Sequence, residues 1–311
     1  MTFARTGSFD WTTADEANSY VDAEGLHIVP TLTTESTDIT PNQLINGFKV
    51  NMTTDSSTWG KCTSDEDSVE DDRHPSDVRY PCAAVSNSTK GQIINPVRSA
   101  RLNTKGKKTI RYGRVEITAR MPKGDWLWPA IWMMPQDSVY GDWPKSGEID
   151  IAESRGNDAR TYDMGDNIVS SALHWGTATL NDRWRMSYGE WGGSRVRYTQ
   201  KFHTYGLEWS EKYLFTWLDG RLRVSAYCPS ALFTSRIPLS PSSPLDGRAF
   251  SLSEHVERRH PMVLGSSPPQ DRRRGWDGLT KPSIANVGFF FHSLASRLFR
   301  FPQEQESVDL R

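Results

Sequence analysis

Apolar and polar side chains alternate along much of the first 228 residues, which is the pattern of strands with one buried face. The longer alternating segments are residues 92–102, 111–121, 128–134, 147–154, 170–175, 204–209 and 213–227. Residues 18–30 predict two short strands around a turn at residues 22–25. The Asp219-Gly220 pair inside the last long segment is a strong hairpin signal. The pattern therefore predicts an all-β chain.

The composition changes after Cys228. Eleven of the 12 tryptophans and all 10 tyrosines precede this residue, whereas the rest of the chain is rich in Ser, Pro and Arg. Such a composition usually marks a linker or a disordered segment. We therefore predict one β domain at residues 1–228 and a poorly ordered tail at residues 229–311.

Three carboxylates occur within six positions, in the segment Gly147-Glu148-Ile149-Asp150-Ile151-Ala152-Glu153. In an extended strand Glu148 and Asp150 point to one face and the two isoleucines point to the other. Strict alternation places Glu153 on the apolar face. One extra residue near Ala152, a β-bulge, returns Glu153 to the acidic face, and bulges are frequent beside active sites.

Two carboxyl groups on one face suit a retaining glycosidase, which needs a nucleophile and an acid/base about 5–5.5 Å apart. Asp150 lies between the two glutamates and can hydrogen-bond to one of them, which helps to separate their pKa values. Two other interpretations stay open. The acids can be the polar face of an ordinary exposed strand, or they can hold calcium, although no loop of calcium-binding spacing accompanies them.

Aromatic residues surround the acidic segment in the sequence. Trp128 and Trp132 precede it, and His174 and Trp175 follow it. Indole rings pack against the apolar faces of sugar rings, and their N–H groups can bond hydroxyls. The same rings can equally belong to a hydrophobic core, and a single histidine is often structural. We treat all four as candidate substrate-binding residues.

Several of these segments, in this order, resemble the laminarinase-like endo-β-1,3(4)-glucanases of glycoside hydrolase family 16, from about residue 18 to residue 227. The matching pieces are Tyr112-Gly113-Arg114-Val115-Glu116, Trp128-Pro129-Ala130-Ile131-Trp132-Met133, residues 146–153 and His174-Trp175. The resemblance implies a concanavalin A-like (jelly-roll) β-sandwich of two curved antiparallel sheets, with a glycan groove.

The resemblance also implies a role for each acid. Glu148 is then the nucleophile, Glu153 the acid/base and Asp150 the support of Glu148, in a retaining endo-β-1,3(4)-glucanase that needs no cofactor. The final strands of the family have no counterpart after Cys228, so we predict a sandwich that is incomplete at its C-terminal end. The alternatives are a β-glucan-binding protein without hydrolysis and an inactive product of an aberrant gene model.

The remaining features concern partners and location. A formal net charge of −1 gives no reason to expect nucleic acid, and no apolar stretch is long enough to span a bilayer. We expect a monomer that binds β-glucan polysaccharide, with no metal in the reaction and a structural calcium ion left open.

Cys62 and Cys82 are candidates for a disulfide, and Asn51 and Asn87 begin glycosylation sequons. These features and the resemblance favour an extracellular or cell-wall location. Residues 1–7 contain no apolar signal segment, so we expect the native start to lie upstream of Met1.

Overall fold

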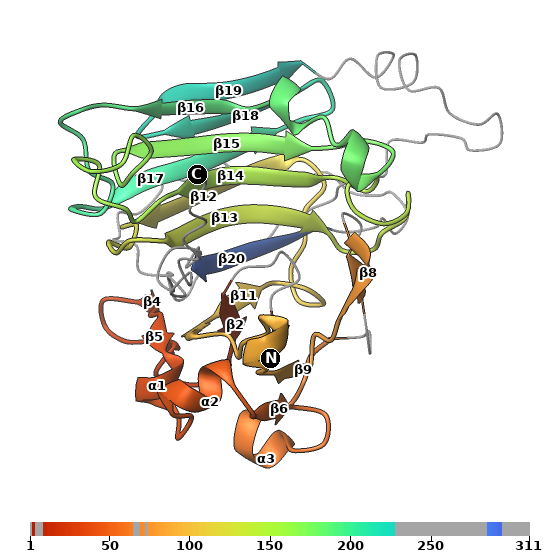
Figure 1. The fold of residues 1–311 in the computed structure, drawn as a ribbon. Coiled ribbons are helices and arrows are strands. Elements are labelled where there is room, and N and C mark those ends of the chain that lie inside the picture. Colours follow the sequence, from red (N-terminus) through yellow and green to blue (C-terminus); the bar gives the residue numbers. More distant parts are fainter. Residues whose placement is uncertain (1, 4–8, 65–68, 72–73, 228–284, 294–311) are drawn as a thin grey trace, which may run out of the picture.

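The computed structural model describes residues 2–3, 9–64, 69–71, 74–227 and 285–293. Two antiparallel sheets lie face to face and form most of the molecule (Figure 1). The first, here called the acid-bearing sheet, has the strand order β11 (Arg101–Asn103), β20 (Ala285–Ser293), β13 (Leu127–Pro135), β14 (Glu148–Ser154), β15 (Ile168–His174) and β16 (Gly189–Gly192). The second sheet has the order β12 (Gly113–Ala119), β17 (His203–Trp209), β18 (Tyr213–Leu218) and β19 (Arg221–Tyr227). The predicted β-sandwich is therefore confirmed.

The main core fills the space between these two sheets. It consists of Ala119, Met121, Ile131, Met133, Ile149, Ile151, Ala152, Val169, Tyr198, Tyr205, Leu207, Trp209, Leu214 and Leu218. Most of these residues occupy alternate positions of their strands, as the apolar pattern predicts. Burying one Leu or Ile side chain contributes about 1.5–3 kcal/mol to folding, so this cluster fixes which face of each strand points outward.

The predicted bulge in β14 is confirmed. Trp132 of β13 pairs with Asp150, but the preceding residue, Ile131, pairs with Ala152, so Ile151 is the extra residue. The pairing with β15 shifts at the same place, between Asp150 and Glu153. The bulge therefore brings Glu148, Asp150 and Glu153 to the same face of the sheet.

One strand departs from the sequence-based prediction, which named no strand after Cys228. Residues 285–293 form β20, and they pair with β13 along nine positions and with β11 along three. A short apolar run inside a Ser/Pro/Arg-rich segment gives little strand signal, whereas an open edge of β13 offers unpaired backbone groups to any extended segment. The remaining residues of the predicted tail, 229–284 and 294–311, lie outside the described residues.

The N-terminal part forms a smaller lobe below the sandwich (Figure 1). Its elements are β1 (Thr2–Phe3), β2 (Asp10–Thr12), β3 (Ser19–Val21), β4 (Leu26–Ile28), β5 (Thr31–Leu32), α1 (Thr33–Ser36), α2 (Pro41–Ile45), β6 (Lys49–Asn51), α3 (Ser56–Trp59), β7 (Val69–Asp71), β8 (His74–Arg79), β9 (Ala83–Val85), the 3-10 helix η1 (Ser88–Lys90) and β10 (Val97–Ser99). The predicted turn at residues 22–25 joins β3 to β4. A second core packs around Trp11, whose indole N–H donates to Thr33 Oγ1 at 3.0 Å.

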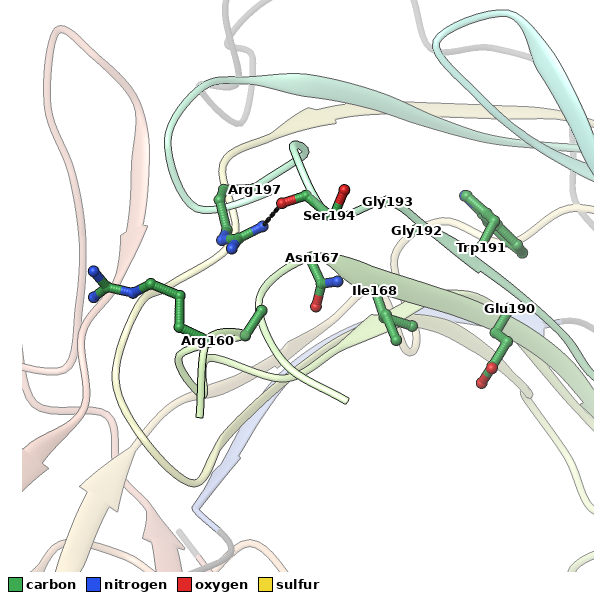
Figure 2. A pocket seen from close by; sticks show the side chains of 10 residues that line it. Arg160, Asn167, Ile168, Glu190, Trp191, Gly192, Gly193, Ser194 and Arg197 are labelled. Carbon is green, nitrogen blue, oxygen red and sulfur yellow. Dashed lines mark hydrogen bonds between the residues drawn. The ribbon is translucent and has the colours of Figure 1, made fainter. Parts of the chain in front are cut away.

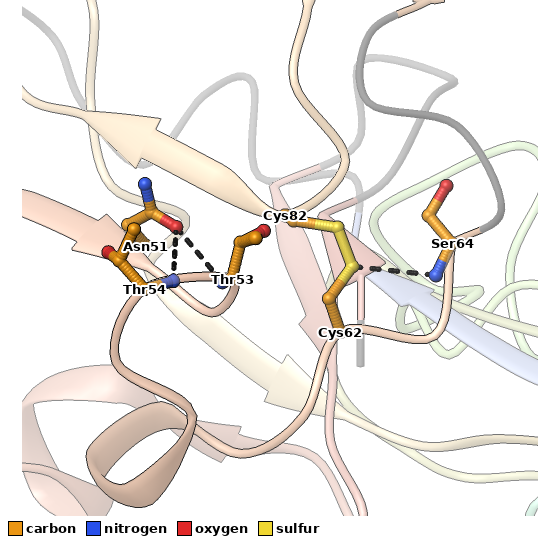
Figure 3. Close-up of a disulfide and its surroundings, with 6 residues drawn as sticks. All are labelled: Asn51, Thr53, Thr54, Cys62, Ser64 and Cys82. Carbon is orange, nitrogen blue, oxygen red and sulfur yellow. Dashed lines mark hydrogen bonds between the residues drawn. A yellow bond between two sulfur atoms is a disulfide. The ribbon is translucent and has the colours of Figure 1, made fainter.

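The segment around the two candidate cysteines contains the short elements from α3 to η1. Within it Cys62 and Cys82 form a disulfide, with 5.5 Å between their Cα atoms (Figure 3). Asn51 Oδ1 accepts the backbone N–H groups of Thr53 and Thr54. Asn87 Oδ1 caps η1 in the same way. Glycosylation of the two asparagines stays a prediction.

Candidate active site

The three acids stand at consecutive outward positions of β14, each opposite a defined residue of β15. Glu148 pairs with His174, Asp150 with Ala172 and Glu153 with Ser170. On the other side of β14, Trp132 pairs with Asp150 and Ala130 with Glu153. Because cross-strand partners share a face of the sheet, His174 and Trp132 lie on the same face as the acids. We call this face of the acid-bearing sheet the site face.

Glu148 is half-buried and bonded to an indole. Trp143 Nε1 donates to Glu148 Oε2 at 2.5 Å from the loop that precedes β14. Burial raises the pKa of the Glu148 carboxyl well above its usual range, and the charge of Asp150 raises it further. His174 and the Trp143 hydrogen bond act in the opposite direction. The indole N–H only partly offsets the raised pKa, but it acts in favour of the ionised form of Glu148, which is the form that a nucleophile requires.

Asp150 is buried, with 3% of its surface exposed. Burial raises the pKa of its carboxyl well above the usual range, and the Glu153 charge adds to this effect, whereas a hydrogen bond with Glu148 opposes it. Asp150 Oδ2 also lies 3.1 Å from His174 Nε2. Asp150 is thus in contact with both Glu148 and His174.

A second carboxylate stands behind His174. His174 Nδ1 lies 2.5 Å from Asp182 Oδ2, and the Asp182 side chain is 8% exposed. The imidazole also lies between two indoles, with ring centroids 5.3 Å from Trp143 and 6.3 Å from Trp184. Trp175, which follows β15, donates its backbone N–H to Asp182 Oδ1. His174 therefore joins the cluster of acids, whereas the described contact of Trp175 is structural.

Two of the candidate substrate-binding residues, Trp128 and Trp132, have an arginine over one ring face. The guanidinium of Arg101 is 4.4 Å from the centroid of Trp132, and that of Arg155 is 4.9 Å from the centroid of Trp128. Such cation–π contacts hold an indole in one orientation. Trp132 is only 9% exposed, and its Nε1 has no hydrogen-bond partner among the described residues.

The site face continues to the edge strand β16. Glu190 pairs with Ser170, which places it on the site face, and Tyr188 donates its hydroxyl to Glu190 Oε2 at 2.6 Å. Burial raises the pKa of Tyr188 to about 12, with Glu190 contributing. A cavity of about 600 Å³ lies beside this edge (Figure 2). Its lining residues are Ala159, Arg160, Asn167, Ile168, Glu190, Trp191, Gly192, Gly193, Ser194 and Arg197.

The sequence patterns assign no role to four residues near the acids, namely Trp143, Asp182, Trp184 and Tyr188. All four lie in the connections next to β14 and β15, where no strand pattern assigns a face. Their only signal in the sequence is a concentration of aromatic and acidic residues just before Glu148 and just after His174.

Neither a metal-binding cluster nor a membrane-spanning helix is found in the part of the chain that the structure describes. Among them, no group of three or more His, Cys, Asp or Glu side chains is arranged to hold a metal ion. In the same part of the chain, no helix has the length and apolar character needed to cross a membrane.

Fold and site together define the class of protein. The molecule is a β-sandwich that carries three carboxylates and indole rings on one outer face, an arrangement that suits a carbohydrate ligand. Residues 46–243 match the family Glycosyl hydrolases family 16. The chain belongs to this family, as the sequence motifs predicted.

Named relatives fall into two groups. Over 146 residues the chain is 42% identical to a β-1,3-glucan-binding protein of Penaeus monodon, covering 47% of this chain and 39% of the relative. Over 139 residues it is 40% identical to a glucan endo-1,3-β-glucosidase of Cryptopygus antarcticus, covering 42% of this chain and 46% of the relative. The chain thus spans less than half the length of these two relatives.

Solved structures resemble the chain over a longer stretch. The laminarinase catalytic domain of Thermotoga maritima is 17% identical, with a TM-score of 0.47 over 92% of this chain and 73% of that one.

Proposed function

We propose that the chain is a retaining endo-β-1,3(4)-glucanase that hydrolyses β-glucans such as laminarin. The observation that carries this proposal is the bulge in β14, because it aligns Glu148, Asp150 and Glu153 on one face. The glucanase among the relatives supports the substrate class. The extended site face, from Trp128 to Glu190, suits a long polysaccharide and hence cleavage within the chain.

In the proposed reaction Glu148 attacks the anomeric carbon while Glu153 protonates the leaving oxygen, which forms a glycosyl-enzyme. Water then attacks this intermediate, and Glu153, now ionised, takes its proton. The Trp143 N–H stabilises the Glu148 carboxylate before the attack and when it leaves. Asp150 is hydrogen-bonded to Glu148, so the protonation state of Asp150 sets how much negative charge stands beside the nucleophile.

The test is release of reducing sugar from laminarin, with lichenan and agarose as further substrates. Removing the nucleophile in Glu148→Gln should lower kcat by about 10³-fold or more, because a neutral amide cannot form the covalent intermediate. The matched control is Glu116→Gln, an exposed carboxylate on β12 of the second sheet that pairs with Arg114 at 2.7 Å. Laminarin turnover by Glu148→Gln near the parent rate contradicts the nucleophile assignment.

A second candidate function is β-glucan binding without hydrolysis. The relative at 42% identity is named as a β-1,3-glucan-binding protein, which favours this candidate. Saturable binding of laminarin by the parent, with a cooperative unfolding transition and no reducing sugar released, identifies it. Loss of the cooperative transition itself points to the third alternative, a chain that does not fold.

Two further properties concern where the protein is found and its oligomeric state. We propose an extracellular or cell-wall location on the basis of the Cys62–Cys82 disulfide and the two sequons, and we propose a monomer as the oligomeric state. Sedimentation of the secreted protein and a mobility shift after glycosidase treatment test these points.

A further inference from the structure

We infer that Asp182 is a positioning residue that acts on Asp150 through His174. This inference rests on the proposed function, because it concerns the same acids. The three side chains form a continuous line of contacts, from Asp182 Oδ2 to His174 Nδ1 at 2.5 Å and from His174 Nε2 to Asp150 Oδ2 at 3.1 Å. Asp182 lies outside the motifs of residues 146–153 and His174-Trp175 that carry the family resemblance.

The backbone fixes the Asp182 carboxylate. Its Oδ1 accepts the backbone N–H groups of Trp175 and Trp184, each at 3.2 Å. These two residues lie on either side of Asp182 in the connection between β15 and β16, so the loop closes around the carboxylate. With Oδ1 held in this way, Oδ2 is directed at the imidazole, and the aspartate has little freedom to turn elsewhere.

The contact with Asp182 selects the tautomer of His174. A carboxylate oxygen that accepts from Nδ1 requires the proton on Nδ1, and the neutral ring then presents Nε2 as a hydrogen-bond acceptor. Nε2 faces Asp150 Oδ2. Oδ2 is buried and has no hydrogen-bond partner among the described residues, so a small rotation of the ring or of the Asp150 carboxyl brings the two atoms into line. A proton that then leaves Oδ2 binds Nε2, and Asp182 stabilises the imidazolium that results.

The surroundings keep this line of contacts in place. Among the described residues, the titratable groups facing His174 are Glu148 and Asp150 from β14 and Asp182 from the loop after β15. The rings of Trp143 and Trp184 lie beside the imidazole. Each ring nitrogen of His174 thus faces a carboxylate, and two indoles lie beside the ring. Of the two carboxylates, Asp150 acts on Glu148 directly, whereas Asp182 reaches the acids through the histidine.

The variant that tests the inference is Asp182→Asn. In this variant the side-chain amide replaces Oδ2 and donates to Nδ1 of His174. The proton of the neutral ring must then lie on Nε2. Nε2, which accepts a hydrogen bond in the parent, becomes a donor toward Asp150. We expect kcat on laminarin to fall by about 10- to 100-fold, as for other residues that orient a functional side chain. The KM should stay unchanged, and the pH profile of kcat should shift.

A matched control exists on the second sheet. His203 Nδ1 lies 2.7 Å from Asp219 Oδ2, so Asp219→Asn makes the same chemical change in a histidine–aspartate pair far from the acids. This control should leave kcat and its pH profile unchanged. In a His174→Gln background Asp182→Asn should have no further effect on kcat, because residues that act through one another are not additive.

Nitrogen-15 NMR of the His174 ring gives a readout that does not depend on turnover. We expect the Nδ1–H tautomer in the parent and the Nε2–H tautomer in Asp182→Asn. An Nε2–H tautomer in the parent overturns the inference, as does an Asp182→Asn variant with the parent's kcat and pH profile. If Asp182→Asn does not fold, the tautomer of His174 in the parent alone decides whether the inference stands.

A parent that releases no sugar contradicts the proposed function alone, and the NMR signals then decide whether Asp182 sets the tautomer.

Discussion

The two sheets of the sandwich share one core but differ on their outer faces. In the second sheet β12 and β17 pair without a shift over seven positions, and the charged pair Arg114–Glu116 is exposed. In the acid-bearing sheet the register shifts in β14, and the outer face holds carboxyl groups whose pKa values burial raises. The regularly paired strand β12 thus carries a solvated charged pair, whereas the bulged strand β14 carries carboxyl groups removed from water.

This difference shows which charges have a cost. A solvated ion pair such as Arg114–Glu116 contributes only about 0–1 kcal/mol to the stability of the fold. A buried carboxyl group loses hydration that its neighbours only partly replace. A face that keeps two such groups beside a third carboxyl, that of Glu153, therefore gives up stability, and the proposed chemistry explains why it does so.

The largest expected effect comes from the same substitution made on each sheet. Glu153→Gln removes the proposed acid/base, and kcat on laminarin should fall by about 10²–10⁴-fold. Glu116→Gln, in the exposed pair of the second sheet, should leave kcat within twofold. Initial rates of both purified variants give the comparison. Equal rates remove the functional distinction between the two faces.

Two glycines, one in the second sheet and one beside the edge of the acid-bearing sheet, are expected to differ in their tolerance of added volume. A Cβ at Gly206 of β17 meets the Trp217 ring at 2.0 Å, whereas a Cβ at Gly193, beside β16, meets its nearest atom at 3.6 Å. Gly206→Ala should therefore lower the free energy of unfolding by about 1–3 kcal/mol. Gly193→Ala should change it by less than about 1 kcal/mol. Chemical denaturation measures both.

A Gly206→Ala variant as stable as the parent means that Trp217 does not lie against Gly206. In either case the kcat of the folded fraction should be unchanged, because Gly206 and Trp217 are on the sheet that carries none of the acids.

The sequence allowed the site face to be predicted because the face follows from alternation. The apolar Ile149 and Ile151 must point into the core, which leaves Glu148 and Asp150 on the outer face. Strict alternation would put Glu153 on the inner face, so a bulge was needed to bring it to the outer one. The Asp219-Gly220 turn was predictable for a local reason, since both residues adopt positive φ.

The contacts made by loops were not predictable in this way. Trp143 and Asp182 reach the acids from irregular connections, where the position of a side chain depends on the tertiary path of the backbone. β20 was missed for a related reason. Its pairing with β13 and β11 joins residues at least 150 positions apart, and no local pattern in residues 285–293 specifies that partner.

The smallest expected effects are changes in the free energy of unfolding when Asp150 or Asp219 is made neutral, and the two changes should have opposite signs. Burial raises the pKa of Asp150 in the folded state, so folding takes up a proton and stability falls as pH rises above the unfolded pKa of about 4. The neutral variant Asp150→Asn should therefore raise the free energy of unfolding at pH 7, by on the order of 1 kcal/mol. The gain should disappear below pH 4, where the parent's carboxyl is protonated in both states.

Asp219 of the second sheet should show the opposite sign. Partial burial raises its pKa, but the hydrogen bonds from His203 and Thr204 outweigh this effect and lower it. A lowered pKa contributes stability above the unfolded value that is lost as pH falls, so Asp219→Asn should be slightly destabilising at pH 7. Because this side chain is half exposed, solvent screening keeps the effect below about 1 kcal/mol. Thermal unfolding of both variants between pH 3 and pH 7 measures the two signs, and an Asp150→Asn variant that loses stability at pH 7 means that the buried carboxyl is a net stabilising member of its hydrogen-bonded cluster.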